Sequence, residues 1–124
     1  MPSLATVNNK STTLSALEKA TSLAQAKAIF KKQEKTNTTI PFYIESSEYF
    51  LKWDKEYSFE ILSTIASLAP NNIKALKAYA FVLERRGAYK KVVNIYNRIL
   101  ALRPDSSQSY RDLALAYEAA GDYE

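Results

Sequence analysis

Apolar residues recur at helical spacing along most of the chain, and short polar breaks separate the helices that this pattern predicts. The clearest stripe runs at i, i+3, i+4 and i+7 through Leu76, Tyr79, Ala80 and Leu83. This spacing places the four side chains on one face of a helix, where they can be buried together. Only two glycines and four prolines occur in 124 residues, too few for the many turns of a β fold. The pattern therefore predicts an all-α protein.

The N-terminal part of the chain predicts a polar lead followed by one helix. Residues 1–13 are rich in Ser, Thr and Asn, a composition typical of flexible segments. From Leu14 to Phe30 apolar residues fall at helical spacing, which predicts a single helix over 14–34. We assign this helix and the polar residues after it to an N-terminal segment, 14–38.

An offset of 34 residues relates the segments that follow. Gly87 and Gly121 are 34 residues apart, and the same offset aligns Ser46 with Ala80. A repeat of this length is typical of a helical hairpin, which can bury its apolar face only against a neighbouring hairpin. The offset divides the rest of the chain, residues 39–124, into three units: a degenerate one at 39–72, a well-formed one at 73–106 and a truncated one at 107–124.

Local signals indicate where the helices of these units begin and end. Asn71 or Asn72 can cap the first helix of the well-formed unit, and Gly87 supplies the left-handed residue that ends it. Asp105, with Gln108 three residues later, resembles a capping box at the start of the truncated unit. Each unit is therefore expected to begin at a side-chain cap.

The truncated unit contains its first helix but ends where a second helix would begin. A helix without this cover leaves Leu113 and Tyr117 partly exposed, whereas terminal repeats usually present a polar outer face. We therefore expect that the chain is a fragment of a longer protein, or that a neighbouring molecule covers this end. Self-association through the C-terminal end is the corresponding prediction.

The composition argues against several other classes of protein. Cysteine and histidine are both absent, so the chain lacks disulfides, thiolate metal ligands and the commonest general base. We expect no catalytic activity, no cofactor and no bound metal. No apolar run approaches the roughly 20 residues that cross a bilayer, so no membrane span is expected.

The last two units resemble the tetratricopeptide repeat, a family of helical hairpins. The matching residues are Leu76, Tyr79, Ala80, Leu83, Gly87, Tyr89, Val92, Tyr96, Ile99 and Pro104, and then Tyr110, Leu113, Ala114, Tyr117, Gly121, Asp122 and Tyr123. The resemblance implies a right-handed superhelix of antiparallel helical hairpins, without enzymatic activity, that serves as a protein-interaction or scaffold module. Val92 and Ile99 stand where the family prefers Ala, and these larger side chains are expected to alter the spacing of the helices.

The resemblance also implies a binding groove, because the first helix of each hairpin lines the concave face in this family. The residues assigned to it are Lys74, Lys77, Phe81, Glu84, Arg85, Gln108, Arg111, Leu115 and Glu118. A solvated helix face is the alternative for each residue taken alone. Phe81 and Leu115 favour the groove, since two apolar side chains on a polar face indicate that something covers them. The cations around them favour an acidic partner segment with apolar anchors.

Two other functions stay open at this point. Residues 73–124 contain nine Lys or Arg against six Asp or Glu, which allows RNA binding by a helical repeat, although the acids interrupt the basic patch. The other alternative is a passive spacer. Stretches such as 107–114 also look like the tetratricopeptide segment of large bacterial proteins with vault/inter-alpha-trypsin or von Willebrand-type modules, which are often attached to the cell envelope. That resemblance implies a periplasmic or envelope-associated location.

Overall fold

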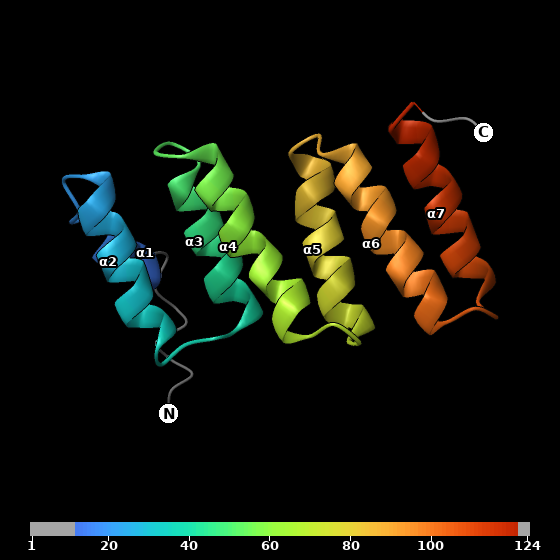
Figure 1. Ribbon diagram of the computed structural model, residues 1–124, viewed down its shortest axis with the longest axis horizontal. Coiled ribbons are helices and arrows are strands. Elements are labelled where there is room, and N and C mark those ends of the chain that lie inside the picture. The colour runs from blue at the N-terminus through green and yellow to red at the C-terminus, as the bar shows by residue number, and fades with distance from the viewer. Residues whose placement is uncertain (1–11, 122–124) are drawn as a thin grey trace. The chain divides into compact units, whose positions relative to one another are not determined.

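Every regular element in the part of the chain that the computed structural model describes, residues 12–121, is a helix (Figure 1). The helices are α1 (Thr12–Leu17), α2 (Leu23–Glu34), α3 (Ile40–Phe50), α4 (Lys55–Leu68), α5 (Ile73–Arg85), α6 (Tyr89–Leu102) and α7 (Ser107–Ala119). The all-α class is confirmed. The chain divides inside α4 into two compact units, Met1–Leu62 and Ser63–Glu124. Of the lead-in expected over residues 1–13, only the last two residues are described, and they begin α1.

The single helix expected over residues 14–34 is wrong, because the chain breaks between α1 and α2. Ser22 caps α2, and its hydroxyl accepts a hydrogen bond from the backbone N–H of Gln25 at 3.1 Å. The side-chain oxygen of Gln25 in turn accepts from the backbone N–H of Thr21 at 2.7 Å and from its hydroxyl at 2.8 Å. These reciprocal bonds satisfy N–H groups that a helix start leaves without partners, so capping outweighs the continuous apolar spacing.

Aromatic side chains form the core of the first unit. The ring of Phe30 on α2 stacks on that of Phe42 on α3, with centroids 5.4 Å apart. It also makes edge-to-face contacts with Phe50 at 6.0 Å and with Tyr57 on α4 at 6.3 Å. Phe30, Phe42 and Phe50 are each at most 2% exposed. Offset-stacked and edge-to-face ring pairs stabilise a fold in addition to the hydrophobic effect of the area that they bury. Phe30 therefore contributes to the packing of α2 against both α3 and α4.

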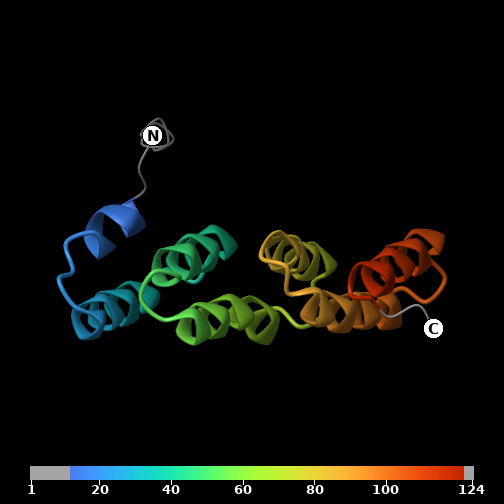
Figure 2. The ribbon, with the colours of Figure 1, turned by 90° about the horizontal axis from the view of Figure 1, so that it is seen from above.

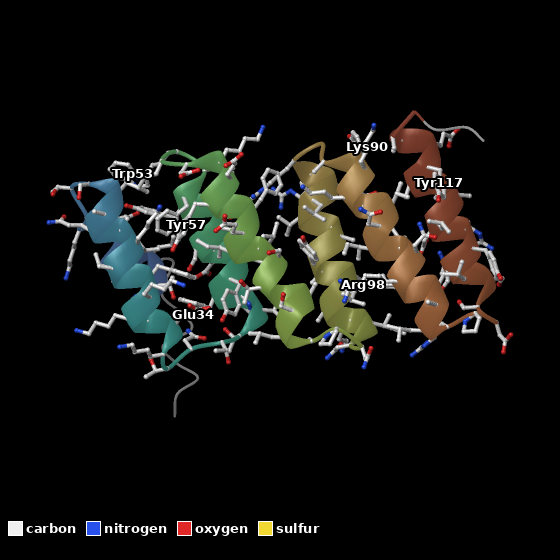
Figure 3. The ribbon with its side chains drawn as sticks, viewed as in Figure 1. Glu34, Trp53, Tyr57, Lys90, Arg98 and Tyr117 are labelled. Carbon is white, nitrogen blue, oxygen red and sulfur yellow. The ribbon has the colours of Figure 1, made fainter. Side chains whose placement is uncertain are left out.

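Hydrogen bonds from tyrosine hydroxyls add to this core. Tyr43 donates to the carboxylate of Glu34 at 2.8 Å, and Tyr49 donates to the backbone carbonyl of Leu17 at 2.8 Å. Burial raises the pKa of Tyr43 well above its ordinary value, and the hydrogen bond to Glu34 and its charge raise the pKa further. The bonds connect α3 to α2 and to α1, so the short first helix is held by α3. Figure 3 shows Glu34 and Tyr57 in this part of the chain.

The buried positions of α3 correct its alignment with α5. Six side chains are buried in each helix, and the two sets match at an offset of 33 residues: Phe42, Tyr43, Ser46, Ser47, Tyr49 and Phe50 in α3, and Ala75, Leu76, Tyr79, Ala80, Val82 and Leu83 in α5. Ser47, and not Ser46, therefore corresponds to Ala80. The difference arises before the next helix. Four residues, 51–54, lie between Phe50 and α4, whereas five, 84–88, lie between the matching Leu83 and α6, so the connection from α3 to α4 is one residue shorter.

The other helices keep the offset of 34 residues. The bounds of α4 and α6, 55–68 and 89–102, differ by 34 at both ends, and so do those of α5 and α7, 73–85 and 107–119. Gly87 and Gly121 follow α5 and α7 at φ 75° and 81°, the left-handed backbone that glycine tolerates best. The helix end expected at Gly87 is confirmed, and Gly121 follows α7 in the same way.

The helix starts in the second unit agree only in part with the sequence signals. Asn72 caps α5, and its side chain accepts from the backbone N–H of Ala75 at 3.0 Å, as expected. At α7 the expected capping box of Asp105 is wrong, because Ser106 is the cap and accepts from the backbone N–H of Ser109 at 3.2 Å. Both Asp and Ser are good caps, so the sequence alone did not separate two adjacent candidates.

In the second unit α6 packs against both α5 and α7 (Figure 2). Figure 2 shows α5 and α7 in one layer, with α6 in a second layer. The α5 stripe that the sequence predicted is buried, and Val92, Ile95 and Ile99 are the buried residues of α6. Tyr96, which matches the tetratricopeptide pattern together with Val92 and Ile99, is only half-buried. Ile95 takes its place in the core.

Candidate interaction face on α5 and α7

The nine residues assigned to the groove all lie exposed on α5 and α7, the two helices that pack on α6. On α5 they are spaced at i, i+3, i+7, i+10 and i+11, which places them on one side of the helix. The residues on α7 repeat the first four of these spacings at an offset of 34. We call this set the α5–α7 face; it consists of Lys74, Lys77, Phe81, Glu84, Arg85, Gln108, Arg111, Leu115 and Glu118.

Phe81 is the main apolar group on the α5 part of this face. Its side chain is 57% exposed. The guanidinium of Arg85 lies over the Phe81 ring, 5.8 Å from its centroid, a cation–π contact that orients both groups. Lys77 lies one turn earlier on the same side. The exposed ring therefore lies between two cations.

Leu115 holds the corresponding position on α7 and is also 57% exposed. Arg111 lies one turn before it. The side-chain amide of Gln108 donates to the carboxylate of Asp112 at 2.7 Å, and Arg111 donates to the side-chain oxygen of Gln108 at 3.5 Å. This short chain of contacts holds Gln108 and leaves Leu115 next to a cation and to Glu118. The α7 part thus repeats the apolar and basic groups of the α5 part.

Tyr96 on α6 is influenced by carboxylates of both neighbouring helices, which the sequence did not predict. Burial raises the pKa of Tyr96 above its ordinary value, and the carboxylates of Glu84 on α5 and Asp112 on α7 raise the pKa further. The Tyr96 hydroxyl therefore lies within electrostatic range of both helices. In the sequence this residue is only a match to the tetratricopeptide pattern. The hydroxyl of a tyrosine needs a polar environment, which favours a position at the edge of a core over its centre. This property of Tyr is the only feature of the sequence that indicated its position.

The charges and the apolar residues of this face together favour a ligand that is negatively charged and carries apolar groups. Four cations of the face, Lys74, Lys77, Arg85 and Arg111, stand against its two carboxylates, Glu84 and Glu118, and the carboxylate of Asp112 lies beside the face. The face therefore carries a small positive excess around two exposed apolar side chains. In residues 12–121 no cluster of carboxylates is arranged to hold a metal ion. The apolar and charged side chains of the α5–α7 face are suited to apolar contacts and ion pairs with a ligand.

Comparison of this chain with protein-family models, with curated proteins and with solved structures finds no match. Within the described range, none of the helices has the length and apolar character that crossing a membrane requires.

Proposed function

We propose that this chain is a non-enzymatic protein-interaction module, and that a segment of a partner protein binds on the α5–α7 face. The observation that carries the proposal is the pair of exposed apolar residues, Phe81 and Leu115, at equivalent positions of two helices that pack on the same α6. Large apolar groups on an exposed helix face, rimmed by charged residues, mark interaction sites. Such an exposed apolar residue beside charged residues occurs on both α5 and α7.

The proposal includes the finer architecture, a right-handed superhelix of tetratricopeptide-like antiparallel hairpins. Three observations support it: the 34-residue offset between the bounds of α5 and α7, the positive φ of the glycine after each, and the matching offset between α4 and α6. In such an arrangement the first helices of successive hairpins share one face. Phe81 and Leu115 then contact the same ligand.

The partner segment that fits this face is acidic and carries two apolar side chains. Phe81 and Leu115 each offer an exposed apolar surface, and burial of such a side chain is worth about 1.5–3 kcal/mol. Lys77, Arg85 and Arg111 flank these two residues and attract carboxylates, which adds orientation and speeds association. An amphipathic helix or an extended strand can present this pattern.

The test is selection from a displayed peptide library rich in Glu, Asp, Leu and Phe, followed by affinity measurement with the selected peptide. The double variant Phe81→Ala/Leu115→Ala should bind it at least about 10-fold more weakly, since buried anchors at the centre of an interface contribute most of its energy. The matched control is Leu68→Ala/Leu102→Ala, which removes two apolar side chains, 56% and 37% exposed, outside this face. The control should bind as the wild type does.

Equal affinity of the wild type and Phe81→Ala/Leu115→Ala would remove the α5–α7 face from consideration. Failure to select any peptide would do the same. A parallel titration with single-stranded RNA at low salt tests the nucleic-acid alternative. Binding there, lost as salt rises, would replace the peptide proposal with RNA binding.

A further inference from the structure

A second face of α7, distinct from the α5–α7 face, is apolar and only partly covered within the described residues. It consists of Tyr110, Leu113, Ala114 and Tyr117, and we call it the open face. Tyr110 is 56% exposed, Ala114 is exposed, and the other two are half-buried. The hydroxyl of Tyr117, which Figure 3 labels, accepts a hydrogen bond from the side chain of Asn97 on α6 at 3.4 Å.

The equivalent residues of α5 show what such a face requires. At an offset of 34 they are Leu76, Tyr79, Ala80 and Leu83, and all four are at most 7% exposed. They belong to the helix that packs against α6, which follows α5 after the three-residue link 86–88 and therefore runs antiparallel to it. The same pattern of residues on α7 is thus suited to an antiparallel helix with an apolar stripe.

We infer that the open face binds the open face of a second copy of this chain, with the two α7 helices antiparallel and crossing at Ala114. Ala114 is the smallest residue of the face and lies near its middle, so the two backbones can approach closely there. Tyr110 and Tyr117 lie one turn before and almost one turn after it, and each contributes a large apolar ring. A two-fold axis then makes the contact self-complementary.

The charges beside the open face select this orientation. Arg111 lies three residues before Ala114, and Glu118 lies four residues after it. These two residues occupy the same flank of the helix, because they are seven positions apart. Antiparallel helices related by a two-fold axis bring equal flanks together, so Arg111 of each copy meets Glu118 of the other. A parallel pair would instead place the flank with Arg111 and Glu118 against the opposite flank of the second copy, which carries Ser109 and Ala116, so these two charges would not pair.

Sedimentation equilibrium of the 124-residue chain over a range of concentrations tests this inference. The mean mass should rise from 14.0 kDa towards twice that value as the concentration approaches about 1 mM, because an interface of two single helices is small and therefore weak. Ala114→Arg should hold the mass at the monomer value, since it places two cations against each other at the crossing point. Ala114 is exposed and Arg is a good helix former, so the fold is retained and circular dichroism checks it.

Two comparisons make the result specific. Ala119→Arg introduces the same residue at an exposed position of α7 away from the open face, and it should associate as the wild type does. Arg111→Glu and Glu118→Arg should each weaken association, and the two together should restore it. Monomer mass at every concentration would overturn the inference, and so would equal weakening by Ala114→Arg and Ala119→Arg. Because the readout is mass alone, failure here leaves the peptide-binding proposal standing.

Discussion

Replacing Phe30 by Ala should lower the free energy of unfolding by about 3–5 kcal/mol, since it leaves a cavity where four aromatic rings met. Phe30 is 2% exposed and contacts the rings of Phe42, Tyr43, Phe50 and Tyr57. These rings come from α3 and α4, whereas Phe30 lies on α2. The loss therefore affects packing among three helices. Urea unfolding monitored by circular dichroism measures it.

Phe81→Ala is the matched control, because it makes the same chemical change at an exposed position. With its ring 57% exposed, Phe81 should contribute no more than about 0.5 kcal/mol to stability. Equal destabilisation by the two substitutions would contradict the assignment of Phe30 to the core and of Phe81 to the surface.

Leu76→Ala should lower the free energy of unfolding by about 2–5 kcal/mol, whereas Tyr110→Ala should change it by less than about 1 kcal/mol. The two residues hold equivalent positions on α5 and α7, but Leu76 is fully buried and Tyr110 is 56% exposed. The difference follows from the α6 helix, which covers the stripe of α5 and leaves the open face of α7 only partly covered. Thermal and urea unfolding at low protein concentration, where the chain is a monomer, measure both variants.

A loss of more than about 2 kcal/mol for Tyr110→Ala would show that the ring is buried in the monomer. That result would also remove the basis for association through the open face, because the face would already be covered.

Much of the second unit could be predicted from the sequence. The stripe of α5, the cap at Asn72 and the helix end at Gly87 are strong local signals, since each depends on a residue type that suits one backbone geometry. The exposure of Phe81 and Leu115 also followed, because the buried stripe left these residues on another side of the helix.

Three features could not be predicted, because the local sequence is compatible with more than one structure at each of them. The break before α2 rests on Ser22 and Gln25, a pair that also fits inside a continuous helix. The register of α3 differed by one residue because the link from α3 to α4 has no glycine to fix the alignment. Tyr96 has the apolar body of a core residue, and only the packing of α5 and α7 around α6 shows where its hydroxyl lies.

Chemical-shift mapping can locate the proposed binding of a partner segment on the α5–α7 face. A ¹⁵N-labelled chain is titrated with the peptide selected from the acidic and apolar library, below the concentration at which the chain self-associates. The largest shifts should fall on the amides around Lys77, Phe81, Arg111 and Leu115, with smaller shifts on the buried stripe of α6. Shifts centred instead on α1 to α3, or none at saturating peptide, would contradict it.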